Sequence, residues 1–160
     1  MGGWSAANLS CEAVLERGSG LGAAAAAVDA MSGNLHQMCE RNASPGEVRA
    51  YMSSFPVDRR LRPDGHGRIP LYYAAAYASA ELVALLLESK SDEQTGTTDN
   101  RGFLPLHCAA LTGQVENVRL LLAANPACAS IPVGDMKGCL PLHCAMMGEG
   151  ASVAMLDVLY

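Results

Sequence analysis

The five-residue sequence LPLHC occurs twice, at positions 104–108 and 140–144, and each copy places a histidine beside a cysteine. Imidazole nitrogen and thiolate sulfur are common zinc ligands, and a thiol next to an imidazole can act as a nucleophile. Zinc needs its ligands within about 2.3 Å, and thiol catalysis needs the cysteine and histidine within hydrogen-bond reach. The elements that carry the two copies therefore decide whether either chemistry is possible.

Both copies belong to a longer repeat. Leu71, Leu106 and Leu142 are spaced 35 and 36 residues apart, and Leu35 lies another 36 residues upstream of Leu71. Three of the units share the pattern D-x-x-G-x-[IL]-P-L, and recurrence of fixed positions at a nearly constant period predicts a repeat architecture. The fixed positions are Asp64, Gly67, Pro70 and Leu71, then Asp99, Gly102, Pro105 and Leu106, then Asp135, Gly138, Pro141 and Leu142.

Each unit carries the signals of a turn followed by two helices. Asp and Gly three residues apart predict a tight turn in which glycine takes a positive φ. Proline then begins the first helix, where it loses no hydrogen bond, and in the third unit Gly113 ends that helix. Val115, Val118 and Leu121 recur at helical spacing, which predicts a second helix with one apolar face.

This unit resembles the ankyrin repeat, which consists of a β-turn and two helices with a T-P-L-H-x-A signature. The third unit, DNRGFLPLHCAALTGQVENVRLLLAANP, is the best match. The resemblance implies an all-α solenoid of about four helix-turn-helix repeats with short β-hairpin or turn fingers. The repeats are expected at about 31–63, 64–98, 99–134 and 135–160, with the last one truncated inside its second helix. That truncation favours a piece of a longer protein, or an end that a partner covers.

The chain departs from the signature at several positions. Ile69, Leu104 and Leu140 replace the threonine, which removes a hydroxyl that could cap the first helix and leaves apolar side chains to pack between neighbouring turns. Tyr72 replaces the histidine in the second unit, and the first unit lacks the D-x-x-G turn. The extra residues of the period are expected in a loop, for which the polar segment 88–98 is the obvious place.

Residues 1–30 do not follow the repeat and are rich in alanine and glycine. Ser10 could cap a short helix that ends at Gly18, and a second helix could follow before the first unit. We interpret this segment as a helical cap on the stack, and a flexible tail is the alternative.

The repeat register favours a structural role for the two LPLHC histidines. In the family the signature histidine ties the start of the first helix to neighbouring turns, which implies this role for His36, His107 and His143. The phenol of Tyr72 can form a hydrogen bond in place of the imidazole, but it is a poor substitute for a metal ligand. Equivalent helices of adjacent repeats also pack roughly 8–10 Å apart, too far for shared zinc ligands. No catalytic residue, cofactor or metal is therefore expected.

Composition limits the class of partner. The 160 residues carry a net charge of −5, and nucleic-acid binding is disfavoured because phosphate contacts need clustered Lys and Arg. The apolar runs fall short of the roughly 18 residues of a membrane helix. No secretory signal is recognisable, so the six cysteines are interpreted as reduced thiols of an intracellular protein. The cytoplasm is favoured, and the nucleus or an organelle stays open.

We therefore expect a non-catalytic scaffold or adaptor that binds a protein partner. The alternatives are a regulatory segment of a larger enzyme or channel, and a structural subunit of a large complex. From the resemblance, the contact residues should lie on the finger tips and on the concave side of the first helices. The tip residues are His66, Arg68, Asn100, Arg101, Phe103, Met136 and Lys137, and the helix residues are Tyr73, Tyr77, Cys108 and Cys144. Phe103 is expected to contribute most, because a large apolar residue on a turn tip has little structural use.

Overall fold

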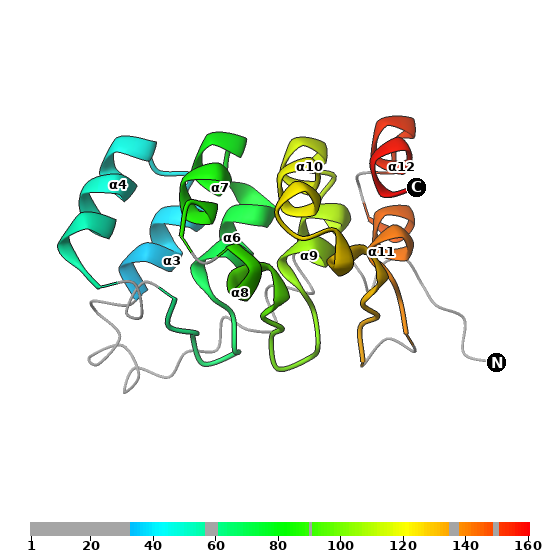
Figure 1. Ribbon diagram of the computed structural model, residues 1–160, viewed down its shortest axis with the longest axis horizontal. Coiled ribbons are helices and arrows are strands. Elements are labelled where there is room, and N and C mark those ends of the chain that lie inside the picture. Colours follow the sequence, from blue (N-terminus) through cyan, green and yellow to red (C-terminus); the bar gives the residue numbers. More distant parts are fainter. Residues whose placement is uncertain (1–32, 57–60, 90, 135–137, 149–150) are drawn as a thin grey trace.

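The computed structural model describes residues 33–56, 61–89, 91–134, 138–148 and 151–160, and in these it shows helix pairs stacked in a single row (Figure 1). The first helices of the pairs are α3 (Gly33–Glu40), α6 (Pro70–Tyr77), α9 (Pro105–Leu111) and α11 (Pro141–Met147). The second helices are α4 (Pro45–Ser54), α7 (Ala80–Leu87), α10 (Val115–Ala124) and α12 (Val153–Leu159). Two short helices, α8 (Ser91–Gly96) and η2 (Pro126–Ser130), lie between pairs. The predicted all-α stack is confirmed, and the segment 1–30 lies outside the described residues.

The core runs along the row between two layers of helices. First helices pack against one another in chain order, and so do the second helices. The signature leucines Leu35, Leu71 and Leu106 are buried between the layers, and alanines such as Ala74 and Ala109 let neighbouring first helices approach closely. Each repeat therefore buries its apolar face against the next one, as stacked repeats must.

The starts of the first helices show how the missing threonine is compensated. Proline occupies the first turn of α6, α9 and α11, and the residue before it is extended. Ile69 and Leu104 are buried, as expected for side chains that pack between turns. The N–H of Leu104 is accepted by Nδ1 of His107 at 3.1 Å, and that of Leu140 by Nδ1 of His143 at 3.0 Å. In α9 and α11 the imidazole thus supplies an acceptor for the main chain at the helix start, whereas α6 carries Tyr72 at this position.

The fingers are tight turns held by an aspartate and a glycine. Oδ1 of Asp64 accepts the main-chain N–H groups two and four residues later, at 2.8 and 3.0 Å. Oδ1 of Asp99 accepts the equivalent pair at 2.9 and 2.8 Å. Gly67 and Gly102 have φ values of 76° and 83°, in the left-handed region that favours glycine. The D-x-x-G pattern therefore encodes the finger directly.

The segment 88–98 is not the loop that its composition predicts. Helix α8 forms within it, and its Gln94 and Thr95 are buried. Nε2 of Gln94 donates to the carbonyl oxygen of Leu86 at 2.8 Å, which fastens α8 to the end of α7. The thiol of Cys128 in η2 donates to the carbonyl oxygen of Thr95 at 3.4 Å. The extra residues of two consecutive repeats are thus short helices that contact each other.

Asn117 of α10 joins the third repeat to the second. Its buried amide nitrogen donates to the carbonyl oxygens of Ala75 at 3.2 Å and Ala78 at 2.9 Å. These acceptors lie at the end of α6, where a helix leaves carbonyls without intrahelical partners. The contact is therefore a C-terminal cap supplied by the neighbouring repeat.

An Asn117→Ala substitution is expected to lower the free energy of unfolding by about 1–3 kcal/mol, because buried carbonyls lose their donor. Urea denaturation followed by circular dichroism measures the change. Arg119→Ala is the matched control, because Arg119 is exposed on the same helix, and its effect should stay within about 0.5 kcal/mol. Equal destabilisation by both variants would contradict this role for Asn117.

Candidate functional site

In the first three repeats, a polar side chain at the same position of the first helix contacts the next finger. Nε2 of His36 in α3 lies 2.9 Å from the carbonyl oxygen of Arg68. The hydroxyl of Tyr72 in α6 donates to the carbonyl oxygen of Phe103. Arg68 and Phe103 hold the same place in consecutive fingers, directly after the turn glycine. The signature side chain therefore joins each repeat to the main chain of the next.

His107 continues this arrangement in the third repeat. Because its Nδ1 accepts the N–H of Leu104, its Nε2 carries the proton of the neutral ring and faces the main chain of Ile131 and Cys139. Among the described residues, Nε2 forms no hydrogen bond of ordinary geometry. Burial lowers the pKa of His107 to about 4, although the backbone groups of Cys139 and Ile131 oppose this shift. The ring is therefore neutral at pH 7.

A buried charged network links the first two fingers. The guanidinium of Arg68 lies 3.6 Å from the carboxylate of Asp99, and both side chains are almost fully buried. The hydroxyl of Tyr73 donates to Oδ2 of Asp64 at 2.7 Å. Burial raises the pKa of Tyr73, and the Asp64 carboxylate raises it further. Arg68 thus holds neighbouring fingers together and is not the tip contact that the sequence predicts.

Three further residues expected at the contact surface are also buried. Phe103 is only 1% exposed, and Cys108 and Cys144 are buried as well. The ring of Phe103 packs edge-on against His107, with centroids 6.0 Å apart. The prediction for Phe103 is wrong because the residue after the turn glycine leads into the helix start, and its side chain enters the stack.

The buried thiols are poor nucleophiles. Burial raises the pKa of Cys39 to about 12 and that of Cys144 also to about 12. Burial likewise raises the pKa of Cys128. These cysteines therefore stay protonated near neutral pH. Because the thiolate is the reactive form, they are unreactive there.

Of the remaining expected contact residues, those that the structure describes do reach the surface. Asn100 is exposed at the tip of its finger, and His66 and Arg101 are half-buried beside it. On α6, Tyr73 is half-buried and Tyr77 is 37% exposed. The predicted contacts Met136 and Lys137, together with the turn residue Asp135, lie outside the described residues.

Two half-buried tip side chains have polar atoms that nothing in the described part of the chain satisfies. Nε2 of His66 and Nη1 of Arg101 are shielded from water, and neither has a hydrogen-bond partner there. Both residues lie two positions after the finger aspartate, so they are equivalent in adjacent fingers. The N–H of Asn100 donates to the carbonyl oxygen of His66 at 2.9 Å, which fixes the spacing of the two fingers. The guanidinium of Arg101 also lies over the ring of Phe103, 5.4 Å from its centroid.

The described residues also bear on metal binding and on membrane crossing. They contain no group of three or more His, Cys, Asp or Glu side chains arranged to hold a metal ion. Within the same residues, none of the helices combines the length and the apolar character that crossing a membrane requires.

Comparison with known proteins identifies the repeat. Residues 35–131 match the family described as "Ankyrin repeats (3 copies)". The chain is 41% identical to inversin of Danio rerio over 63 residues, which is 39% of this chain and 6% of inversin. It is 36% identical over 62 residues to the tyrosine-protein kinase HTK16 of Hydra vulgaris, covering 39% of this chain and 8% of the kinase. It is 37% identical over 84 residues to the human transient receptor potential cation channel subfamily A member 1, covering 50% of this chain and 8% of the channel.

The match therefore spans less than a tenth of each of these relatives. The matched family covers more than half of the chain, and the paired helices, the D-x-x-G fingers and the signature side chains agree with it. The chain belongs to the ankyrin-repeat family.

Proposed function

We propose that this chain is a non-catalytic, intracellular protein-interaction module that binds a partner through its finger tips and the adjacent ends of its first helices. Ankyrin repeats are generally protein-binding modules. The observation that carries the proposal is a pair of polar atoms at equivalent finger positions, Nε2 of His66 and Nη1 of Arg101, which have no hydrogen-bond partner among the described residues. Because these two nitrogens have almost no water-accessible surface, a ligand reaches them only if the side chains turn outward, and that turn breaks no hydrogen bond of these atoms within the described residues.

The chemistry of the two side chains indicates the kind of group that would bind. A guanidinium pairs best with a carboxylate, and both Arg101 and a protonated His66 nitrogen donate to carbonyl or carboxylate oxygen. Tyr73 and Tyr77 lie on the first helix of the repeat that carries His66, and tyrosine and arginine are enriched among residues that dominate binding energy. The partner surface is therefore expected to present acidic side chains or main-chain carbonyls.

The absence of catalysis is part of the proposal, and the thiol environment supports it. The side chains of Cys39 and Cys144 are buried and protonated near neutral pH. A thiol enzyme needs the opposite environment, partly exposed and electropositive.

The test is quantitative affinity capture with the full chain as bait. A His66→Ala/Arg101→Ala double variant is expected to lose at least one partner protein by about tenfold, because two desolvated donors are removed. Arg119→Ala is the control, since it removes an exposed positive charge from an outer helix and should retain the same partner. Circular dichroism verifies that the variants are folded. Equal capture by wild type and the double variant would reject these tips as the binding surface.

A regulatory segment of a larger enzyme or channel is the second candidate. It is favoured because two of the relatives are a tyrosine kinase and a cation channel, each matched over only 8% of its length. The complete reading frame distinguishes the candidates. A kinase or pore domain in the same frame supports regulation, and a frame limited to these residues contradicts it.

A further inference from the structure

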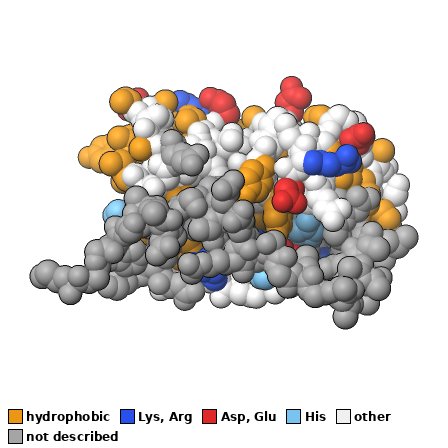
Figure 2. Space-filling model, turned by 180° about the vertical axis from the view of Figure 1, so that it is seen from behind, with side chains coloured by type: hydrophobic (Ala, Val, Ile, Leu, Met, Phe, Trp, Pro, Cys, Tyr) orange, Lys and Arg blue, Asp and Glu red, His pale blue; other side chains and the backbone are white. Residues whose placement is uncertain are grey.

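The layer of second helices carries most of the exposed acidic side chains of the described residues. Each second helix contributes one, and α8 adds two more. Figure 2 shows acidic side chains along the edge that these helices form, at the top of the view. The residues are Glu47, Glu81, Glu116 and Asp157 on the second helices, and Asp92 and Glu93 on α8. This layer is therefore unsuited to an acidic partner.

The second and third fingers present the opposite charge. Their aspartates, Asp64 and Asp99, accept hydrogen bonds from the main chain of their own finger. The second carboxylate oxygen of each contacts a buried or half-buried side chain of the protein. Arg62 is exposed beside the second finger, and Arg101 is half-buried on the third. The charge that these described fingers offer to a partner is therefore positive.

The main chain fixes the distance between the two cation-bearing tips. The N–H of Asn100 donates to the carbonyl oxygen of His66 at 2.9 Å, and its side-chain amide donates to that of Gly65 at 3.4 Å. His66 and Arg101 hold the same place in their fingers, so they are one repeat apart. Because equivalent elements of neighbouring repeats pack about 8–10 Å apart, the two tips offer donors at roughly that interval.

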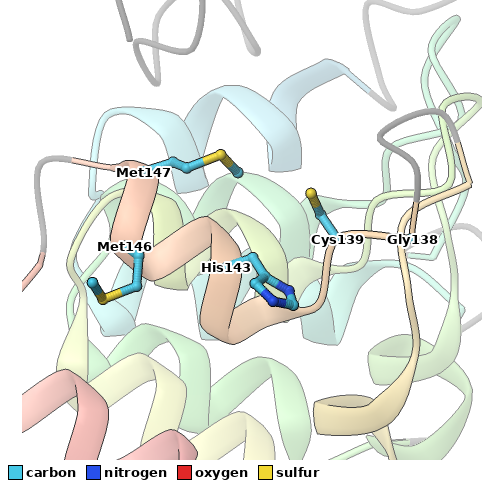
Figure 3. A pocket seen from close by; sticks show the side chains of 5 residues that line it. All are labelled: Gly138, Cys139, His143, Met146 and Met147. Atoms are coloured by element: carbon cyan, nitrogen blue, oxygen red, sulfur yellow. The ribbon is translucent and has the colours of Figure 1, made fainter. Parts of the chain in front are cut away.

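The fourth finger continues this register in the sequence. Lys137 lies two positions after Asp135, as His66 and Arg101 do after their aspartates, but it lies outside the described residues. Gly138 has a φ of 79° and leads through Cys139 into α11 (Figure 3). The turn glycine therefore has the same conformation in the second, third and fourth fingers. The site proposed below is defined by the second and third fingers alone.

A polyproline II helix has the repeat that matches these fingers. It contains three residues per turn with a rise of 3.1 Å, so side chains three residues apart lie on one face, about 9 Å apart. A β-strand alternates its side chains and places neighbours on one face about 7 Å apart, which does not match. An acidic residue at every third position of a polyproline II segment therefore meets successive fingers.

The aromatic side chains of α6 favour the same kind of segment. Tyr73 and Tyr77 lie four residues apart, on one side of the helix. The hydroxyl of Tyr73 donates to Asp64, so this aromatic surface adjoins the finger that carries His66. Proline-rich segments dock on aromatic surfaces in the polyproline II conformation. The equivalent residues of α9, Cys108 and Thr112, are smaller and offer no such surface.

We propose that the finger tips bind a proline-rich, acidic segment of a partner protein in the polyproline II conformation, with Asp or Glu at every third position. One carboxylate pairs with the guanidinium of Arg101, and a carboxylate one turn away accepts the Nε2–H of His66. Both side chains turn outward, which breaks no hydrogen bond of Nη1 or Nε2 within the described residues. The inference rests on the proposed function and adds the chemical class and the charge spacing of the partner.

The test is an NMR titration of the ¹⁵N-labelled full chain with two blocked peptides, EPPEPPE and EPEPEPP. The peptides have the same composition and charge, and they differ in whether the acidic residues recur at every third or every second position. We expect saturable shifts of the Asn100 and Arg101 resonances. The dissociation constant should be about fivefold lower for EPPEPPE, because its carboxylates reach both tips at once.

Variants of the chain show whether the charge of the finger is responsible. Arg101→Ala should weaken binding of EPPEPPE by about tenfold and abolish the preference between the peptides, since one paired carboxylate loses its partner. Arg101→Lys keeps the charge but loses the planar fork, so it should weaken binding less. Arg119→Ala is the matched control, because it removes the same charge from an exposed position on α10 and should bind as wild type does. Circular dichroism verifies that each variant is folded.

Equal dissociation constants for the two peptides overturn the proposal, and so does equal weakening by Arg101→Ala and Arg119→Ala. The affinity capture described above fails separately. If the His66→Ala/Arg101→Ala variant loses a partner protein but wild type does not distinguish the peptides, the finger tips are a binding surface and the proposed acidic segment is wrong.

Discussion

A Gly148→Ala substitution is expected to lower the free energy of unfolding of the fourth repeat by roughly 3 kcal/mol or more, as overpacking against a rigid neighbour does. A Cβ at this position would lie 2.0 Å from the carbonyl oxygen of Leu111 and 2.9 Å from its Cα. The obstacle is main chain at the end of α9, so it cannot rotate aside. Gly148 has a φ of −86°, which any residue can adopt, so the close contact alone requires glycine.

The effect of Gly148→Ala should be local, because each repeat contacts only its neighbours. Hydrogen exchange measured by mass spectrometry is expected to become faster in α11 and α12 and to stay unchanged in α6 and α7. Gly46→Ala is the matched control, since no atom lies within 4 Å of its added Cβ. It replaces glycine within α4 and should be neutral or slightly stabilising. Unchanged hydrogen-exchange protection of α11 in the Gly148→Ala variant would contradict the prediction. It would show that Gly148 does not lie this close to Leu111 in solution.

Acidification from pH 7 to pH 4 is expected to lower the free energy of unfolding by up to roughly 3 kcal/mol through His107 alone. Burial lowers the pKa of His107 from its ordinary value of 6.5 to about 4. The folded state therefore binds fewer protons than the unfolded state between these two values. Stability is full above pH 6.5 and is lost as the pH falls toward 4.

Urea denaturation of wild type and His107→Gln at several pH values between 7.5 and 4 measures this contribution. Glutamine at the third helical position can still reach back toward the N–H of Leu104, but it does not titrate. Carboxylates and the other histidines are common to both proteins, so the difference between the two pH dependences isolates His107. If the free energies of unfolding of the two proteins depend on pH in the same way, His107 binds protons equally well in the folded and unfolded states, and the prediction is wrong.

The order of the elements could be predicted from the sequence because local chemistry specifies it. Asp64 and Gly67 form a finger through contacts within five residues, and proline after the finger begins the helix. The position of the Phe103 side chain could not be predicted in the same way. It depends on Tyr72, a residue of another repeat, whose hydroxyl binds the main chain of Phe103.

The short helix α8 could not be predicted for a related reason. Its segment is polar and lacks apolar periodicity, a pattern that predicts a loop. Gln94 and Thr95 are buried because Leu86 and Cys128, from two different repeats, provide their hydrogen-bond partners. The unsatisfied nitrogens of His66 and Arg101 also become visible only when burial is known. Both residues lie two positions after the aspartate of their finger. This shared spacing is visible in the sequence and is the signal that relates the two residues.

The contact between the signature side chain and the next finger involves only the main chain of that finger. Arg68, Phe103 and Cys139 therefore differ in charge, size and polarity while holding the same place. The hydrogen bond of this joint can therefore form with different side chains at that place, although the buried side chains of Arg68 and Phe103 have packing roles of their own. Neighbouring repeats with different residues at this place are consequently joined by the same contact to the main chain.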